Sequence, residues 1–419
     1  GDEQLDRLIA QALQGNPTLK VAQARLARAQ AVTELAGAAS LPQVNGALDL
    51  TRQQYTANGA VPPPLAGAIR NSGTLQFTAG WELDFFGKNQ AALDAALGTA
   101  RAAQADADAA QVLLAGNVAR AYVQLARVND QRAVAQRTLA QREESLRLVR
   151  DRVQAGLDTQ LELRQSEGAL PEARQQIEAL DEQAQLAQHA LAALTGQGNR
   201  DVVRTQPSLA ALKALPGPAQ LPADLLAQRA DIAAARWRIE AAGYDLKNAK
   251  AQFYPNINIA AFAGLSSIGL GRLLDTGSEQ WGVGPAIRLP IFEAGRLRAN
   301  LRGKTADLDA AIESYNAAVL DAIHDASDQV ASGRSIARQQ AEQRDALTAA
   351  EGAYQIALQR YKAGLGTYLN VLAAETSVLN QRRLGVDLSA RALETQVGLF
   401  RAFGGGYSAA AASVTSALK

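Results

Sequence analysis

Residues 74–88 read TLQFTAGWELDFFGK, and this stretch raises the question that decides the fold. Apolar and polar side chains alternate along it, which is typical of a β-strand with two different faces. The apolar set includes the aromatic residues Phe77, Trp81 and Phe85. Such a strand covers the core of a soluble sandwich or faces lipid in a membrane barrel, so the fold depends on what the apolar face touches.

Composition excludes several classes of protein. The 419 residues carry a formal net charge of +1, so no basic field is expected to attract nucleic acid. Cysteine is absent, which removes disulfides, thiolate metal sites and cysteine nucleophiles. The chain also lacks methionine and begins with Gly1, so we expect that this is not the translation start, and removal of a signal peptide stays open.

Hydropathy gives no transmembrane helix, because no run of about 18 apolar residues occurs. A transmembrane β-barrel stays open as an alternative, since its strands need only about 9–11 alternating residues.

Two long stretches, 89–154 and 296–362, have apolar residues at heptad spacing without clusters of Pro or Gly. A helix of this length spans roughly 90 Å at 1.5 Å per residue, far more than a helix of an ordinary globular domain. We therefore expect a coiled-coil-like assembly.

Two windows, 41–87 and 254–292, interrupt the helical pattern with two alternating segments each. They predict four amphipathic strands in two hairpins. Aromatic residues are concentrated in these windows, and several fall near strand ends, where the aromatic girdles of a membrane barrel lie. Aromatic residues also favour strands in general, so their position alone does not distinguish the two folds.

The two halves of the chain match each other. AGLDTQLELRQSE (155–167) aligns with AGLGTYLNVLAAE (363–375), and ASLPQVN (39–45) aligns with QFYPNIN (252–258). This indicates a tandem duplication in which each copy reads helix, hairpin, long helix, turn, helix. The expected domains are a first repeat, a Pro/Gly-rich linker, a second repeat and a flexible tail: 1–204, 205–225, 226–403 and 404–419.

Four strands do not close a barrel, and open sheet edges are not tolerated in lipid. A membrane barrel built from this chain would be shared, and three chains would supply twelve strands.

Four motifs carry a resemblance through their order and spacing: the junctions LDFFGK (83–88) and LPIFEAGR (289–296) and the turns RVQAGLDTQLEL (152–163) and RYKAGLGTYLNV (360–371). In these motifs the chain resembles the TolC-like outer membrane efflux family, in particular its NodT- and OprM-like lipoprotein branch. The resemblance implies a mainly α fold with a membrane β-barrel. A long antiparallel α-helical barrel would continue from four strands per chain, which contribute to a shared 12-stranded trimeric barrel.

The resemblance also implies a function. The protein would be the exit duct of a tripartite efflux system in the outer membrane of a Gram-negative bacterium, extending into the periplasm. It would passively conduct drugs or other small toxic solutes that arrive from a periplasmic adaptor and an inner-membrane pump. Its partners would be two further copies, the adaptor, the pump and outer membrane lipid. No cofactor, metal or catalytic residue is implied, and a lipid anchor on a cysteine preceding Gly1 stays open.

The tips of the helical hairpins are the first candidate site. Gly156 and Gly364 fall where the heptad pattern stops and restarts, and Thr159 and Thr367 are placed to cap the returning helices. In the family the adaptor meets these tips, so the resemblance assigns docking to Ala155, Gly156, Leu157, Thr159, Ala363, Gly364, Leu365 and Thr367. Turn geometry alone explains the Gly and Thr residues, but it does not explain the leucines.

The resemblance further implies a closed periplasmic gate, with a tyrosine before the turn and acidic residues after it. Tyr361 fits the tyrosine, whereas Asn370 and Ala373 stand where acidic residues are expected. The acidic side chains of a gate would therefore come from Asp158 and Glu162 in the first repeat.

If the strands span a membrane, their polar face lines the lumen and their apolar face meets lipid, with Leu75, Phe77, Trp81, Leu83, Phe85 and Trp281 on the lipid side. The alternative is a non-membrane coiled-coil scaffold or adaptor protein with a small β-sandwich. Enzymatic interpretations are weak, because His189 and His324 have no metal-ligand spacing. GLGRLLDTG (269–277) resembles a phosphate-binding loop only superficially, since it lies between two predicted strands.

Overall fold

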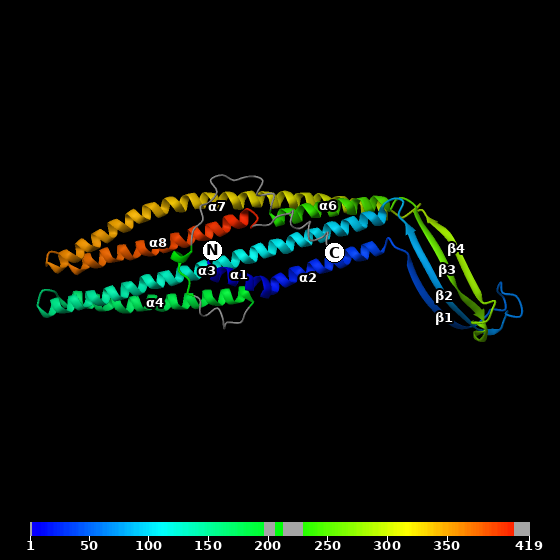
Figure 1. Ribbon diagram of the computed structural model, residues 1–419, viewed down its shortest axis with the longest axis horizontal. Helices are drawn as coiled ribbons and strands as arrows, with labels where there is room; N and C mark the ends of the chain where they lie inside the picture. Colours follow the sequence, from blue (N-terminus) through cyan, green and yellow to red (C-terminus); the bar gives the residue numbers. More distant parts are fainter. Residues whose placement is uncertain (1, 197–205, 213–228, 406–419) are drawn as a thin grey trace. The chain divides into compact units, whose positions relative to one another are not determined.

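The computed structural model describes residues 2–196, 206–212 and 229–405 (Figure 1). Of the predicted linker 205–225, only 206–212 fall among these residues, and they include the short helix η2 (Leu209–Ala211). The rest of the linker lies outside the described residues. The same holds for the predicted tail after Gly405.

The chain is mainly helical, as predicted. The helices are α1 (Glu3–Gly15), α2 (Pro17–Ala38), α3 (Lys88–Gln154), α4 (Gln160–Thr195), α6 (Ala230–Ala251), α7 (Arg296–Lys362) and α8 (Tyr368–Ala402). The predicted long helices 89–154 and 296–362 agree with α3 and α7 to within one residue, because nothing in these stretches competes with the heptad pattern. Within the described parts of the chain, no helix is long and apolar enough to cross a membrane.

The four predicted strands form one antiparallel sheet in the order β1-β2-β3-β4 (Figure 1). They are β1 (Gln43–Gln54), β2 (Ile69–Leu83), β3 (Asn256–Ile268) and β4 (Glu279–Arg288). The two hairpins are joined through β2 and β3, which pair from Ser72↔Ile268 to Leu83↔Ile257. One strand residue was predicted wrongly: β2 ends at Leu83, so Phe85 lies in the turn before α3.

The register places most of the large apolar residues of the four strands on one face. Phe77 pairs with Ala263, which pairs with Trp281. Because side chains alternate along each strand, the rows two residues away share this face. Its apolar members are Val44, Leu48, Leu50, Ile69, Leu75, Phe77, Ala79, Trp81, Leu83, Ile257, Ile259, Ala261, Ala263, Leu265, Trp281, Val283, Pro285 and Ile287. The opposite face carries mainly polar side chains, glycines and alanines, with Phe262 and Ile268 as its large apolar exceptions.

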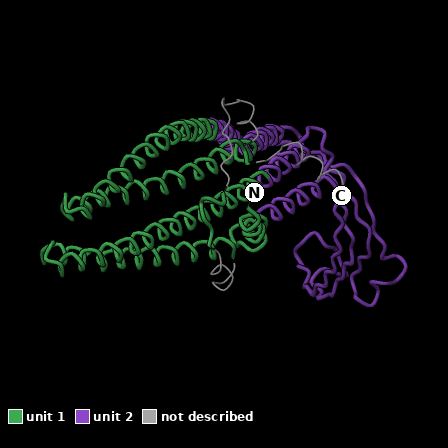
Figure 2. The backbone as a smooth tube through the Cα atoms, turned by 60° about the vertical axis from the view of Figure 1, so that its left-hand side comes forward, with its two compact units in different colours: residues 1–23, 105–233, 317–419 green, residues 24–104, 234–316 purple. Residues whose placement is uncertain are grey.

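The sheet and the helix ends attached to it form one compact unit, 24–104 and 234–316 (Figure 2). Gln43 pairs with Gly80, and Asn256 pairs with Arg288, so every strand meets its helix at the same end of the sheet. Residues 55–68 and 269–278 connect the strands at the opposite end.

The second compact unit contains the helical hairpins α3/α4 and α7/α8 and covers 1–23, 105–233 and 317–419 (Figure 2). One of its cores lies between α1, α3 and α4 and includes Val118, Leu125 and Leu191, all fully buried. Another core joins α3, α7 and α8 near the hairpin tips and includes Val149, Tyr361 and Tyr368.

Candidate functional site

Both helical hairpins turn at their tips through the same backbone geometry. Gly156 and Gly364 have φ values of 68° and 73°, which glycine adopts without the strain that other residues incur. The N–H of Leu157 donates to the carbonyl of Arg152, and the N–H of Leu365 donates to that of Arg360, each at 2.8 Å. Together with the bonds Gly156–Val153 and Gly364–Tyr361, these contacts form a Schellman motif that ends each long helix.

The returning helices begin differently at the two tips. At the first tip, Thr159 forms a capping box: its hydroxyl accepts from the N–H of Leu161 at 3.1 Å, and its own N–H donates to Glu162 at 3.0 Å. Hydrogen bonds from Thr159 lower the pKa of Glu162. Thr367 also stands at a helix start, but its side chain makes no capping bond, so the predicted cap at the second tip is wrong. Asn370 occupies the place of Glu162 there, and the reciprocal bond of a capping box requires Glu or Gln.

Two exposed leucines stand at each tip. Leu157 and Leu365 are 65% and 70% exposed, and Leu161 and Leu369, one helical turn further on, are 63% and 61% exposed. Leu157 and Leu365 lie in the turns, and Leu161 and Leu369 lie in the first turns of α4 and α8, so each tip presents a pair of exposed apolar side chains. Leu161 and Leu369 were not predicted from the sequence, although they occupy matching positions in the two aligned turn motifs.

A small network, which we call the tip lock, joins the first tip to the end of α7. Its members are Arg152, Asp158 and Tyr361. The Nε of Arg152 donates to the Asp158 carboxylate at 2.9 Å, and the hydroxyl of Tyr361 donates to the same carboxylate. The guanidinium of Arg152 also lies 4.7 Å from the centre of the Tyr361 ring. Burial, reinforced by the hydrogen bond to Asp158, raises the pKa of Tyr361.

The structure thus brings together two of the four residues predicted for a gate. Glu162 is engaged in the capping box, and Asn370 is exposed, with its backbone N–H bonded to the carbonyl of Thr367. Arg152 was missed, although a cation in the last turn of a helix is a recognisable signal. Its partner could not be read from the pattern, because the Schellman turn folds Asp158 back beside it.

Farther from the tips, a buried ion pair links three helices. Arg142 of α3 contacts Glu375 of α8 at 3.3 Å, and it donates to the carbonyl of Ala169 in α4 at 2.9 Å. The side chains of Arg142 and Glu375 are only 11% and 8% exposed. Burial raises the pKa of Glu375, although Arg142 opposes this shift.

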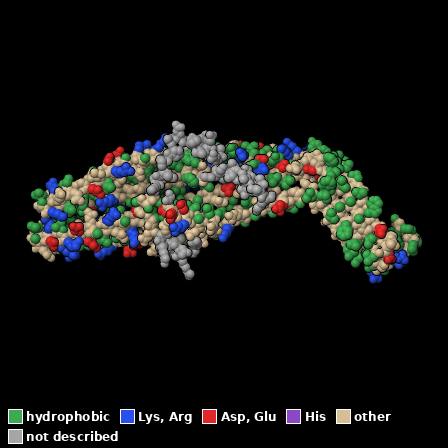
Figure 3. Space-filling view, viewed as in Figure 1, with side chains coloured by type: hydrophobic (Ala, Val, Ile, Leu, Met, Phe, Trp, Pro, Cys, Tyr) green, Lys and Arg blue, Asp and Glu red, His purple; other side chains and the backbone are tan. Residues whose placement is uncertain are grey.

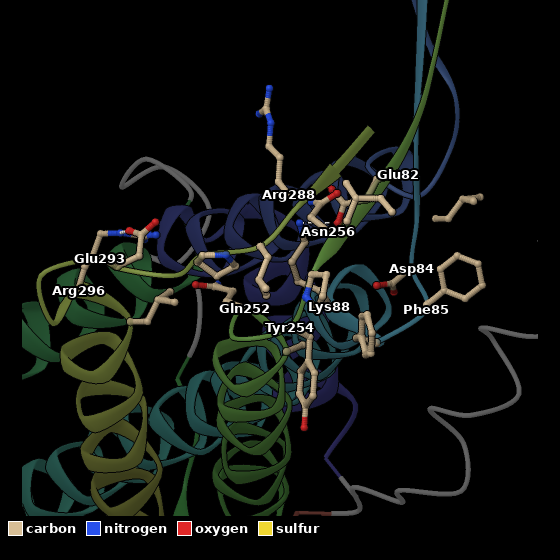
Figure 4. Close-up of a pocket in the computed structure, with 18 residues that line it drawn as sticks. Glu82, Asp84, Phe85, Lys88, Gln252, Tyr254, Asn256, Arg288, Glu293 and Arg296 are labelled. Atoms are coloured by element: carbon tan, nitrogen blue, oxygen red, sulfur yellow. Dashed lines mark hydrogen bonds and ion pairs between the residues drawn. The ribbon is translucent and has the colours of Figure 1, made fainter. Parts of the chain in front are cut away.

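The junction between strands and helices contains an open cleft of about 600 Å³ (Figure 4). Charged groups in the cleft stabilise the junction between β2 and α3. Glu82 forms an ion pair with Lys88, and Asp84 accepts the N–H of Gln90 at 2.7 Å at the start of α3. Gly87, with a φ of 70°, lets the chain turn between β2 and that helix.

A four-stranded sheet with one continuous apolar face, extended by paired long helices that end in matched tips, is the architecture of an outer membrane channel protein rather than of a compact scaffold. The chain matches the family model described as outer membrane efflux protein over residues 8–197 and 221–405. It belongs to this family.

Individual relatives agree with this assignment. The chain is 32% identical over 418 residues to the putative multidrug resistance outer membrane protein MdtQ of Escherichia coli K12, which covers 97% of this chain and 86% of MdtQ. It is 42% identical over 312 residues to the fusaric acid resistance protein FusA of Burkholderia cepacia, which covers 72% of this chain and 57% of FusA. The solved structure of the outer membrane protein VceC from Vibrio cholerae has a TM-score of 0.90 and 35% identity, with 97% of each chain covered.

The predicted function and location, an efflux channel of the outer membrane, are therefore confirmed. The alternative of a coiled-coil scaffold is not favoured. The family and its structural neighbours are channel proteins rather than enzymes.

Proposed function

We propose that this chain forms the homotrimeric exit duct of a tripartite efflux system. Three four-stranded sheets close one twelve-stranded barrel in the outer membrane, and the helices extend into the periplasm as an α-helical barrel. The observation that carries this proposal is the sheet itself: its apolar face is continuous over four strands, while β1 and β4 have no outer neighbour within the described chain. Each unpaired backbone group in lipid costs several kcal/mol, and closure between chains removes both edges.

In this barrel the apolar face meets lipid, including Leu75, Phe77, Trp81, Leu83 and Trp281, and the polar face lines a water-filled lumen. Trp281 and Phe77 are 78% and 58% exposed in the single chain, as lipid-facing side chains are. The duct conducts drugs or other small toxic solutes passively and without chemistry. The names of MdtQ and FusA, which refer to multidrug and fusaric acid resistance, support this solute class.

The tips are the docking surface for a periplasmic adaptor, which in turn joins an inner-membrane pump. The apolar pairs Leu157/Leu161 and Leu365/Leu369 support this assignment, because all four side chains are exposed. Ala155, Thr159, Ala363 and Thr367 flank them on exposed turns. Side chains of this size contribute about 1.5–3 kcal/mol each when a partner buries them fully.

The tip lock holds the duct closed at its periplasmic end. It ties the tip of α3/α4 to the last turn of α7, so separating the two hairpins breaks contacts to a carboxylate that is only 10% exposed. We also propose that the chain is a tandem duplication of 1–204 and 226–403. Its support is that α3 and α7 both contain 67 residues and that α4 and α8 contain 36 and 35.

Disulfide cross-linking between the sheet edges tests the barrel. The chain has no cysteine, so every disulfide would be an introduced one. Leu48→Cys in β1 is combined in turn with cysteine at Trp281, Val283 or Ile287 in β4. Within one chain the two edges lie three strand spacings apart, about 14 Å, beyond the roughly 7 Å that a disulfide can bridge.

We expect at least one combination to give disulfide-linked dimers and trimers on oxidation, and the single-cysteine variants to give none of the trimer. Monomers throughout the series, together with extraction into buffer without detergent, would contradict the proposal.

A further inference from the structure

The end of the sheet that lies away from the helices carries the stretch GLGRLLDTG (269–277), which the proposed function leaves unexplained. It contains the short helix η3 (Leu270–Arg272) and connects β3 to β4. The N–H of Gly269 donates to the carbonyl of Asn71 in β2 at 2.7 Å, and the N–H of Ser266 in β3 donates to the carbonyl of Ser278 at 2.7 Å. The connection is therefore fastened to the sheet at both its ends.

This connection folds onto the apolar face rather than away from it. A Cβ atom added at Gly73 would lie 3.1 Å from a methyl group of Leu270 and 3.1 Å from one of Leu273, with Leu50 of β1 at 3.3 Å. The three leucines thus meet above a residue that has no side chain. Leu274, the next residue, is 80% exposed, so the apolar band of the sheet continues onto the connection.

Two arginines lie at the outer border of this leucine cluster. Arg52 stands two residues beyond Leu50 on the same face of β1, opposite Asn71. Arg272 belongs to η3, next to Leu273. Both side chains are exposed, and neither forms an ion pair or a side-chain hydrogen bond with any residue that the structure describes. In Figure 3 charged atoms gather at this end of the sheet, beyond a band of hydrophobic side chains.

We propose that Arg52 and Arg272 bind the phosphate groups of anionic lipids in the outer leaflet of the membrane, with the acyl chains packed on Leu50, Leu270 and Leu274. This rests on the proposed function, because it requires the apolar face to meet lipid. A guanidinium matches a phosphate through two parallel hydrogen bonds and is weakly hydrated, so it suits the border between acyl chains and headgroups. Arginine stems can also lie along apolar surface while their charge reaches the headgroups.

The position of the charges decides between a lipid site and a general attraction to anions. Arg70 of β2 stands one row from Arg52 at the same end of the sheet, but the register turns it to the polar face. Arg70 is exposed as well, so it carries the same charge at nearly the same level along the strands, but without contact to lipid. Arg70→Gln is therefore the matched control for Arg52→Gln.

The test uses the purified full-length trimer in phosphatidylcholine nanodiscs with lipid A, a doubly phosphorylated lipid, as the probe. Arg52→Gln and Arg272→Gln are each expected to weaken the association of lipid A about fivefold, and the double variant about 25-fold. Arg70→Gln should bind it as the wild type does. Inorganic phosphate at the same phosphate concentration should not compete, since it lacks the acyl chains.

Three results would overturn the inference: unchanged binding in the double variant, equal weakening by Arg70→Gln, or full competition by inorganic phosphate. A fourth result that would overturn the inference involves Glu279, which lies on the apolar face of the edge strand β4. If Arg52 pairs with this residue in a neighbouring copy, Arg52→Gln and Glu279→Gln will lower the thermal stability of the trimer alike and leave lipid binding unchanged. Disulfide cross-linking of the sheet edges separates these outcomes from failure of the barrel itself, because it reports closure irrespective of the lipid bound.

Discussion

Removing a single hydroxyl group should open the periplasmic end of the duct. Tyr361 is only 1% exposed, and its hydroxyl donates to the Asp158 carboxylate that Arg152 also binds. Tyr361→Phe keeps the ring beneath the guanidinium and leaves Asp158 paired with Arg152, so it removes one hydrogen bond and no charge. A hydrogen bond to a charged group contributes about 1.5–3 kcal/mol. The ratio of separated to joined tips should therefore rise about 10- to 150-fold in each protomer.

Single-channel conductance of the trimer in planar lipid bilayers measures this change directly. We expect Tyr361→Phe to raise the open fraction, and Asp158→Asn to raise it further because it also weakens the bond to Arg152. Tyr354→Phe is the matched control, since Tyr354 is buried one heptad earlier in the same helix and lies in the same core. Equal open fractions in the Tyr361→Phe and Tyr354→Phe channels would refute the assignment of the tip lock as a gate.

The remaining predictions concern the tips and the buried ion pair. Leu157→Asp and Leu365→Asp should each weaken adaptor binding, measured by biolayer interferometry, about tenfold or more, because each removes up to about 1.5–3 kcal/mol of apolar burial; trimers on SDS gels should be unchanged. Gly156→Ala should destabilise its tip by about 1–2 kcal/mol through backbone strain at a φ of 68°, seen as faster proteolysis there. Gly168→Ala, inside α4, should instead stabilise the helix by about 0.5–1 kcal/mol, because nothing beyond the backbone of its own helix lies within 4 Å of the new Cβ. Burial raises the pKa of Glu375 above its ordinary value of 4.5, so its contribution to stability is complete below that value and is lost as the pH rises through the raised pKa. The melting temperature of the wild type relative to that of Glu375→Gln, which does not titrate, should therefore rise as the pH falls towards 4.5, and a constant difference would contradict this account.

The sequence predicted much of the tip geometry, and the features that it did not predict have physical causes. Gly156 and Gly364 marked both turns, because only glycine adopts a positive φ there without strain. The four-residue signal of a capping box, Thr159 to Glu162, was also present and distinguishes the first tip from the second. The sequence did not predict which acidic residue contacts Tyr361, because that contact depends on how closely α7 approaches the tip of α3.

The sequence by itself determined the elements of this protein. Alternation at every second residue and apolar heptads are local patterns, so strands, long helices and tips were predicted to within a few residues. Only the tertiary structure decided which elements are neighbours. The pairing of β2 with β3 joins residues far apart in the chain, and it turns two hairpins into one sheet with a continuous apolar face. The tip lock and the leucine cluster at Gly73 likewise arise from contacts between distant segments, which no local period records.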